Sequence, residues 1–581
     1  MIWLLTKIPF LIELIFNGVY ILVYSMRKFK QLPSEWSEHL IDNIIAGYSW
    51  IIPIILFITL VLHYLENDKV EDFFRKYIFS ILIFVPLVIT WGDIEFAYWL
   101  SIVHLLFSVL TFYDLNTQPK NHRSRSLVED KKISLSPKKI PFSSAQIVVL
   151  SFGVFITIMT FLLMLPISGA NGYIVSFIDA LFMVTSATCV TGLATISVKS
   201  DLSVFGQLVL LACMQIGGLG VMTLSASVGI LLGREMPMKE RLVMQDLVSA
   251  YDLESLLELV LDILKYTLVI EFGGAIILTI SFLYDGFEFG TALYMGIYHS
   301  ISAFCNAGIS LFDNNLESYA TNSTVSFTVS FLIIFGGIGF TVLRDLARIF
   351  VQKKSLKNLE VHTKIVVITS FMLIAIGTVI IFFGEFLNSL DGYTLWEKFT
   401  ISFFQSVTTR TAGFNTIPLI NFHTYVIFFM ILLMFIGASP ASTGGGIKTS
   451  TFAIMIQSII ATMKGNSRVE FFNRRASESL VVKAVAISII SMIIVTFFVF
   501  MMMKIEPEQT FLTIMFEVVS AFGTVGLSLG ITPYLSVSGK LLITLLMFIG
   551  RVGPLTLFLA IGEQKVSKGK IEYPEGQIMI G

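Results

Sequence analysis

The chain has 581 residues, of which 55% are hydrophobic and 14% are charged, and its mean hydropathy is +0.83. This composition is typical of a protein dissolved in lipid and excludes a water-soluble globular domain. The formal net charge of −1 gives no indication of a nucleic-acid partner.

Apolar runs close to the roughly 18 to 20 residues that cross a bilayer recur along the whole chain. Helices satisfy their own backbone hydrogen bonds in lipid, so runs of this length predict an all-α polytopic membrane protein. The runs predict about four transmembrane helices in residues 1–115, and further spans from residue 144 onward.

The N-terminal extension, residues 1–115, begins with an apolar run over about residues 2–25. This run lacks a basic start and a small-residue cleavage site, so we predict a retained helix rather than a signal peptide. Four spans that start from an inside N-terminus leave Arg27, Lys28 and Lys30 in an external loop, where nearby acids dilute their charge. Residues 116–143 are polar, basic and rich in proline, which predicts a cytoplasmic linker.

One unit then repeats four times, in residues 144–243, 244–352, 353–475 and 476–564, before a cytoplasmic tail at 565–581. Each unit has a hydrophobic span, a short Ser/Thr-rich helix running into a glycine, and a second span that opens on glycine. The first glycines recur about every 105 to 116 residues, a period that indicates an internal repeat. We expect four pseudo-symmetric helix–pore-helix–helix repeats around one central pore.

Basic residues concentrate in alternate loops, which predicts the orientation of the chain. Lysines and arginines fill the linker and the loops after the first, second and third repeats, whereas acids such as Glu288, Glu317 and Glu506 mark the opposite connections. The basic loops are therefore predicted to be cytoplasmic, and the repeated glycines to lie toward the outer face.

The repeated glycines predict a selectivity filter for K⁺. Stripping water from K⁺ requires several carbonyl oxygens that converge on an axis, and glycine best tolerates the backbone geometry that points consecutive carbonyls inward. The short helix before each glycine directs its partially negative C-terminus toward the same axis. The alternative is that the glycines serve only close helix packing. The predicted filter residues are Val190, Thr191, Gly192, Asn306, Ala307, Gly308, Thr411, Ala412, Gly413, Thr524, Val525 and Gly526.

These segments resemble the KtrB/TrkH/HKT superfamily of K⁺ transporters, most closely the KtrB branch, over roughly residues 140–581. The matches are 189–193 (CVTGL), 304–308 (FCNAG), 409–414 (TRTAGF) and 524–527 (TVGL), and the tail from Tyr573 also resembles KtrB tails. The N-terminal extension departs from this pattern, because KtrB-like proteins generally lack these spans and TrkH-like proteins add only two. A TrkH-type subunit therefore stays an alternative.

The resemblance implies K⁺ uptake across the cell membrane by a homodimer with one pore per subunit, stimulated by Na⁺. It also implies a cytoplasmic KtrA-like or TrkA-like ring that binds a nucleotide. The sequence itself contains neither a Gly-x-Gly-x-x-Gly motif after a strand nor a phosphate-binding loop, so we expect no cofactor on this chain.

A second predicted site is the stretch from Gly437 to Thr449, which combines a proline, small polar residues and three consecutive glycines and so cannot continue as a helix. It is either a kink stabilised by hydroxyl groups or, as the resemblance implies, a mobile loop that blocks the pore beneath the filter. The predicted gate-loop residues are Ser442, Thr443, Gly444, Gly445, Gly446 and Lys448, with the three glycines as hinges.

Charges within the spans are costly and predict functional positions. Arg551 matches the pore arginine of the family and is expected to face the cavity beneath the filter, unless it pairs with a buried acid. Arg410 and Glu517, on neighbouring pore helices, form a hypothetical pair that braces the filters. Lys448 is expected to bind carbonyls that the break in its own helix exposes.

Other functions find less support in the sequence. The seven histidines and three cysteines form no metal-binding pattern, and His299, near the second filter, suits a supporting role in the pore helix. An alternating-access carrier would predict inverted repeats with acidic residues at the midplane, whereas these repeats run parallel. A membrane enzyme would require a nucleophile, a base or a metal cluster in the spans, and none is found.

Overall fold

The computed structural model describes residues 144–220, 256–554, 556 and 557, except 171, 352, 354 and 467, together with 16–27 and the separate residues 41, 42, 45, 47, 56, 98, 101, 102 and 105. Most of the predicted N-terminal spans, the linker 116–143 and the tail 565–581 thus lie outside the described residues. Within the extension, residues 16–27 are helical, and Arg27 pairs with Asp42 at 2.8 Å, so that an acid neutralises a charge of the predicted external loop.

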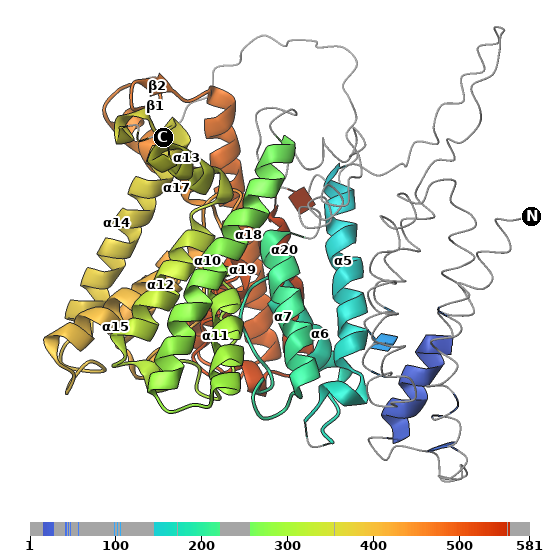
Figure 1. The fold of residues 1–581 in the computed structure, drawn as a ribbon. Helices are drawn as coiled ribbons and strands as arrows, with labels where there is room; N and C mark the ends of the chain where they lie inside the picture. The colour runs from blue at the N-terminus through green and yellow to red at the C-terminus, as the bar shows by residue number, and fades with distance from the viewer. Residues whose placement is uncertain are drawn as a thin grey trace, which may run out of the picture.

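The described region is almost entirely helical and consists of four units of the same design (Figure 1). In each unit a long first helix is followed by a short pore helix and then by a second helix. The units comprise α5 (Ser144–Leu163), α6 (Phe177–Thr188) and α7 (Val204–Leu219); α10 (Leu256–Tyr284), α11 (Phe289–Phe304) and α12 (Ser323–Gly337); α14 (Val361–Gly384), α15 (Leu395–Thr408) and α16 (Thr424–Phe435); and α18 (Glu478–Ile505), α19 (Phe511–Gly523) and α20 (Val537–Val552).

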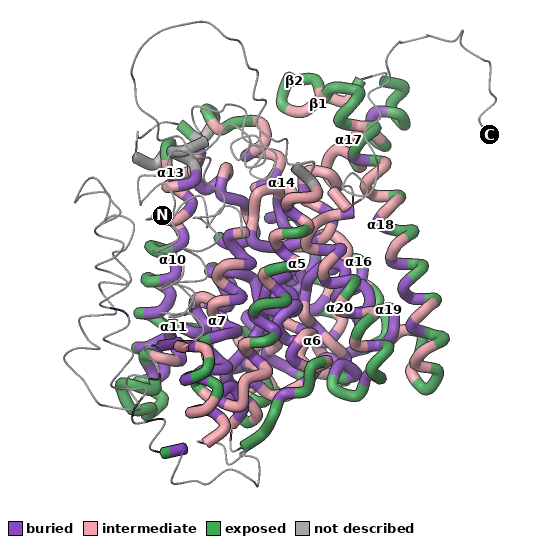
Figure 2. The backbone as a smooth tube through the Cα atoms, turned by 90° about the vertical axis from the view of Figure 1, so that its right-hand side faces the viewer, coloured by how far each residue is buried: buried purple, intermediate pink, exposed green. Residues whose placement is uncertain are grey.

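The four first helices are long and apolar enough to cross a membrane, and a fifth candidate span is the pair formed by α12 and α13 (Phe340–Val351), bent by 102°. Less than half of each first helix is buried within the protein. Figure 2 shows exposed residues along the outer helices and buried residues in the centre. Large apolar side chains such as Phe371, Phe383, Phe497 and Phe500 are exposed on α14 and α18, as expected for helices that face lipid.

Polar caps fix where the short helices begin. Ser176, Thr394 and Thr510 each accept a backbone hydrogen bond at the N-terminus of a pore helix, and Thr394 forms a reciprocal capping box with Glu397. The backbone and hydroxyl of Thr394 lower the pKa of the exposed Glu397 carboxyl. Ser203, Asn322 and Ser536 cap the second helices in the same way. These caps lie in the short connections between helices and fix the first residue of the helices that they cap.

The second helices break at matched positions. Gly220, Gly339 and Gly553 have φ angles of 85°, 99° and 89°, and they end α7, α12 and α20. The glycines Gly217, Gly336, Gly437 and Gly550, here called span glycines, were predicted to open the second spans. That prediction was wrong, because the capped helices begin soon after the filter and these glycines lie at or just beyond their C-terminal ends.

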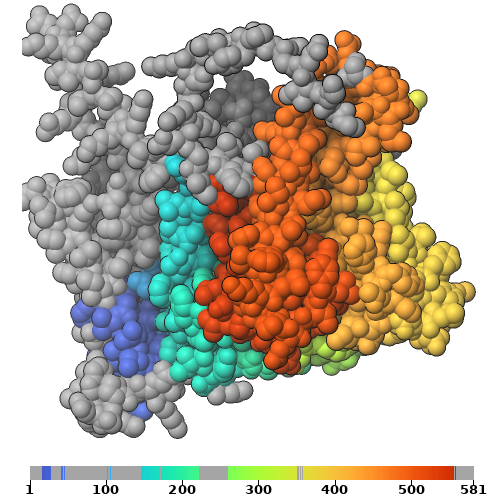
Figure 3. Space-filling view, turned by 180° about the vertical axis from the view of Figure 1, so that it is seen from behind, coloured from blue at the N-terminus to red at the C-terminus, as the bar shows by residue number. Residues whose placement is uncertain are grey.

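The four units close into a ring. The second helix of each unit packs against the pore helix of the next, as α7 with α11, α12 with α15, α16 with α19, and α20 with α6. Figure 3 shows the last of these seams, where the orange and red fourth unit adjoins the cyan first unit. Lys540 of α20 and Asp179 of α6 form a largely buried ion pair across it, with Nζ and Oδ1 2.7 Å apart. The first and last units are therefore neighbours in space.

One end of the molecule carries the described basic loops. There α13, α17 (Thr449–Met463) and a hairpin of β1 (Glu470–Phe471) and β2 (Arg474–Arg475) lie together, at the top of Figure 1. The hairpin turns through Phe472 and Asn473, which both have positive φ, as a tight two-residue turn requires. The pore helices lie toward the opposite end. Three-residue helical turns line the connections there: η1 (Pro166–Ser168), η2 (Glu317–Tyr319), η4 (Leu419–Asn421) and η5 (Thr532–Tyr534); η3 (Leu356–Asn358) lies near the basic end.

Candidate ion pore

The four predicted filter glycines form a closed ring of contacts. A Cβ atom added to any of them would lie within 2.7 Å of the carbonyl oxygen that precedes the glycine of the next unit. These distances are 2.6 Å from Gly192 to Ala307, 2.4 Å from Gly308 to Ala412, 2.7 Å from Gly413 to Val525, and 2.0 Å from Gly526 to Thr191. The ring requires glycine at every position, because a side chain would strike backbone.

The filter backbone alternates in handedness. The glycines have φ angles of 66° to 97°, and the residues two positions earlier, Val190, Asn306, Thr411 and Thr524, have φ angles of 52° to 68°. Such alternation turns successive carbonyls toward the same side of the strand, as a row of cation ligands requires. Positive φ at residues other than glycine costs energy, so the surrounding structure must hold these segments in place.

Hydroxyl groups of the pore helices provide part of that support. Ser186 and Ser520 accept hydrogen bonds from the backbone N–H of Gly192 and Gly526, at 3.0 and 3.1 Å. In the second unit, Ser302 donates instead to the carbonyl of Ile309 at 2.8 Å. All three serines lie six residues before their glycine, a regularity in the sequence that could have identified them.

The third unit differs from this pattern. The position six residues before Gly413 is Val407, which has no hydroxyl. The neighbouring Ser406 donates to the carbonyl of Ile374 on α14, at 2.7 Å. Thr408 supports the strand instead, by donating to the carbonyl of Phe414 at 2.6 Å.

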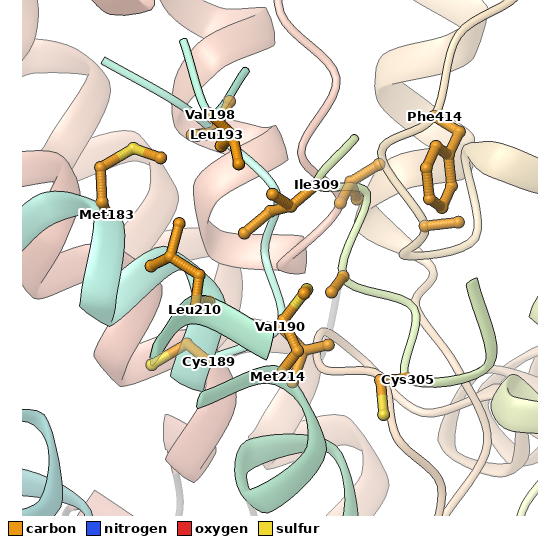
Figure 4. Close-up of a cluster of buried hydrophobic side chains, with 14 of the residues drawn as sticks. Met183, Cys189, Val190, Leu193, Val198, Leu210, Met214, Cys305, Ile309 and Phe414 are labelled. Carbon is orange, nitrogen blue, oxygen red and sulfur yellow. The ribbon is translucent and has the colours of Figure 1, made fainter. Parts of the chain in front are cut away.

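The filters sit in apolar surroundings. Figure 4 shows Val190, Leu193 and Ile309 of the first two filter segments among side chains that include Met183 and Met214. These side chains belong to one hydrophobic cluster in which each is at most 2% exposed. Cys189, Cys213 and Cys305 are buried free thiols. Tight apolar packing behind the strands leaves the backbone carbonyls as the polar groups available at the axis.

The mouth beyond the filters contains an asparagine that the sequence did not reveal. The Asn315 side-chain amide donates to the carbonyls of Gly413 and Gly308, at 3.3 and 3.5 Å. Nearby, Asn415 donates to Glu317 at 2.8 Å. Burial raises the pKa of Glu317, while the Asn415 hydrogen bond opposes the shift. No local pattern distinguishes Asn315 from other loop asparagines, so only the fold shows its position between two filters.

Directly beneath the filters, a loop crosses between the units. After α16 the chain forms a nonhelical loop over residues 437–448, and α17 begins at Thr449. A Cβ on Gly444 would lie 2.1 Å from the hydroxyl of Thr411, and one on Gly445 would lie 2.5 Å from that of Thr524. Of the three predicted hinge glycines, only Gly446 has a positive φ, of 69°. Gly444 and Gly445 instead permit close approach to filter residues.

The loop is hydrogen-bonded to the second and fourth units. Thr443 donates from its backbone to Gly336 at 3.2 Å and from its hydroxyl to Phe304 at 3.3 Å. Gly445 N–H donates to the Thr524 hydroxyl at 2.9 Å. Ser442 donates its hydroxyl within the loop, to the carbonyl of Ser439 at 2.6 Å. The loop is thus an ordered part of the structure, with contacts to neighbouring units that would have to break for it to move.

Two basic side chains hold the loop from the basic end. Arg551 of α20 donates to the carbonyl of Thr443 and to those of Gly217 and Gly218, the last two at 2.5 and 3.1 Å. Among the described residues, Arg551 bonds backbone carbonyls and forms no ion pair with a buried acid. Lys448 donates to the carbonyl of Gly444 at 2.6 Å, the interaction predicted for this lysine.

The predicted pair of Arg410 and Glu517 was wrong. Glu517 accepts hydrogen bonds from Ser528 and Thr532 of its own unit, at 2.7 and 2.5 Å. Arg410 lines a small cavity with Ser370 and apolar residues of α12 and α14, and its Nε has no partner there. Arg410 follows the C-terminus of α15, whereas Glu517 lies in the middle of α19, so the two are at different depths along their helices. The guanidinium is suitably placed to offset the partial negative charge at the end of α15.

Comparisons with known proteins agree with this architecture. The family model for TrkH, described as a cation transport protein, matches residues 128–568. The Ktr system potassium uptake protein B of Bacillus subtilis is 39% identical over 78% of this chain and 100% of the relative, and that of Vibrio alginolyticus is 37% identical over 75% and 94%. The potassium/sodium uptake protein NtpJ of Enterococcus hirae is 34% identical over 76% and 97%. The crystal structure of the potassium transporter TrkH from Vibrio parahaemolyticus shares the fold, with a TM-score of 0.57 at 15% identity over 90% of this chain and 97% of that one.

Proposed function

The chain belongs to the TrkH family of cation transport proteins, and from this premise we propose that K⁺ crosses the membrane along the axis of its four units, bound in turn by the filter carbonyls. The protein is a potassium uptake transporter of the Ktr/TrkH type in the cell membrane. The observation that supports the proposed route is the closed ring of contacts between filter glycines and carbonyls.

The filter would select K⁺ by replacing its water with protein oxygens. Each unit would contribute the carbonyl before its glycine, those of Thr191, Ala307, Ala412 and Val525, so that four oxygens would surround the axis. In every unit a hydroxyl on the pore helix bonds the strand near its glycine, from Ser186, Ser302, Thr408 and Ser520. Selectivity would therefore depend on all four strands together.

K⁺ uptake in cells that lack their own K⁺ transporters tests this proposal, with the native chain compared to Gly413→Ser. The serine side chain would have to displace the carbonyl of Val525. We expect the native chain to favour K⁺ over Na⁺ and the variant to lose most of that preference at equal membrane abundance. Unchanged selectivity in the variant would show that the glycine serves packing only.

The loop at residues 437–448 would act as a gate. It lies directly under filter residues, and its hydrogen bonds to neighbouring units define a closed state. Arg551 would stabilise that state in two ways, because it donates to a loop carbonyl and places a positive charge below the filter. The helices that flank the loop, α16 and α17, would transmit movement to it from the basic end.

Regulation would come from a cytoplasmic ring that binds a nucleotide, with this chain as a homodimer and Na⁺ as an activator. The surface that such a ring could contact includes the exposed hairpin of β1 and β2, with Arg474 and Arg475, next to α17. Uptake should rise when a KtrA-like subunit is co-expressed, and rise again with Na⁺. If hairpin variants with Arg474 and Arg475 changed to Ser respond to the subunit as the native chain does, the hairpin is not the contact.

A further inference from the structure

Each unit has an equivalent position on its pore helix that faces the strand leaving the filter. The four residues lie nine positions before the filter glycine and differ in chemistry: Met183, His299, Phe404 and Glu517. All four are completely buried. The strand that they face determines where the filter carbonyls can sit, because it continues directly from the glycine.

In the fourth unit, the residue at this position makes the strongest hydrogen bonds to the strand that leaves the filter. Ser528, two residues after Gly526, donates to Oε2 of Glu517 at 2.7 Å, and Thr532 donates to Oε1 at 2.5 Å. The two hydroxyls are also 3.0 Å from each other, and Gly530 N–H donates to Ser528 at 3.0 Å. Both carboxylate oxygens are thus used to hold one strand.

The second unit, opposite the fourth across the ring, has a similar connection made by a histidine. The Nδ1 of His299 lies 2.8 Å from the carbonyl of Met295, which can only accept, so Nδ1 carries the proton. Its Nε2 is then an acceptor, and it receives hydrogen bonds from the hydroxyl of Ser310 at 3.0 Å and from Leu311 N–H at 3.3 Å. The neutral ring also stacks on Phe312, with centroids 4.9 Å apart.

At this position the first and third units make only weak hydrogen bonds. In the first, Thr195 N–H donates to the sulfur of Met183 at 3.4 Å, and a thioether is a poor acceptor. In the third, Phe404 offers no polar atom, and the adjacent Gln405 reaches the hydroxyl of Thr416 at 3.4 Å. The hydrogen bonds made from this position are therefore strong in the second and fourth units and weak in the first and third.

We infer that Glu517 and His299 are positioning residues that set the ion preference of the filter by fixing the strands of two opposite units. The strands of the other two units lack a strong hydrogen bond at this position, so the pair formed by Glu517 and His299 has the larger influence on the spacing of the carbonyls. This inference deepens the proposed filter and rests on it. Neither side chain touches the transported ion.

The test is the ratio of Na⁺ to K⁺ uptake in Glu517→Ala and Glu517→Gln, with membrane abundance measured in parallel. Loss of both strong hydrogen bonds should raise the ratio about ten-fold in Glu517→Ala, and Gln, which can still bond both hydroxyls, should keep it within about two-fold of the native value. The Ser528→Ala and Thr532→Val double variant, which removes the partners instead, should match Glu517→Ala. Met183→Leu is the matched control and should leave the ratio unchanged.

The outcomes separate this inference from the proposed filter. If the native chain prefers K⁺ and both Glu517→Ala and the double variant keep its ratio, the positioning role is wrong and the filter stands. A native chain without K⁺ preference would instead contradict the filter itself. If Glu517→Ala is absent from the membrane, the double variant, which keeps the pore helix intact, decides between the two.

Discussion

The second helices of units one, two and four, here called the wall helices, contain their span glycine, whereas α16 of unit three ends before its span glycine and a loop follows. In the wall units a Cβ on the span glycine would meet the C-terminal turn of the unit's own pore helix. These contacts are 1.9 Å from Gly217 to the carbonyl of Thr188, 1.8 Å from Gly336 to that of Phe304, and 2.1 Å from Gly550 to that of Phe522. In the third unit, Gly437 meets the carbonyl of Gly445 at 2.1 Å instead.

This difference shows how one repeat can supply both a helix that packs on a pore helix and a loop that lies beneath the filters. A second helix that packs on a pore helix must keep its position, because the pore helix in turn supports the filter strand. In the third unit the chain leaves the helix after Phe435, and the loop fills the space below the filters that a straight helix would leave open. One proline and three glycines give residues 437–448 a low helix propensity. This low propensity explains why unit three has a loop where the other units continue as helix.

The same substitution at a wall glycine and at the loop glycine should have opposite effects. Gly336→Ala must displace the backbone of a pore helix, so we expect K⁺ uptake to fall at least about ten-fold. Gly437→Ala displaces only the loop carbonyl of Gly445, so uptake should rise about two- to five-fold as the closed state is destabilised. Initial rates of K⁺ uptake at equal membrane abundance measure both. A loss of uptake in both variants would remove the distinction between wall and loop.

Arg551→Gln should open the loop. It removes the guanidinium that joins Thr443 to Gly217 and Gly218, as well as the charge beneath the filter. Hydrogen bonds to charged groups contribute about 1.5–3 kcal/mol each, so an increase in uptake rate of about three- to ten-fold is expected.

Arg551→Lys is the control for this prediction, because it keeps the charge but lacks the planar guanidinium fork that spans Thr443, Gly217 and Gly218. Its uptake rate should lie between those of the native chain and Arg551→Gln. A lower rate in Arg551→Gln than in the native chain would show that the arginine supports the pore rather than closing it.

Breaking the ion pair between Lys540 and Asp179 should lower the stability of the protein without changing its ion preference. Lys540→Met leaves Asp179 without its partner at the seam between the first and fourth units, which should cost about 3 kcal/mol of unfolding free energy. The melting temperature in detergent should fall, and the double variant with Asp179→Asn should recover most of the loss. A change in the K⁺ to Na⁺ uptake ratio of folded Lys540→Met protein would mean that the seam also shapes the filter.

Sequence patterns were sufficient for the features that repeat. The filter glycines occur at a regular spacing, and the loop follows from residues that cannot form a helix, so both could be predicted from the chain alone. The steric reason for each glycine could not, because it depends on a carbonyl about a hundred residues away in the next unit.

The wrong predictions concern where the second helices begin and whether two side chains pair. The span glycines end these helices because polar caps start them soon after the filter. A pairing of Arg410 with Glu517 needs the depth and rotation of two helices, and a single sequence gives neither. Asn315 reaches two filters only because the fold brings the strands of two units together.

The most direct test of the ring is a set of four single variants, Gly192→Ala, Gly308→Ala, Gly413→Ala and Gly526→Ala, compared for K⁺ and Na⁺ uptake. Gly153→Ala in α5 is the control, since a Cβ there would meet no atom within 4 Å. We predict that all four filter variants lose K⁺ preference while the control keeps it. A filter variant that retains native selectivity at native abundance would show that its unit does not contribute to the ring, and would contradict a pore built from four equivalent parts.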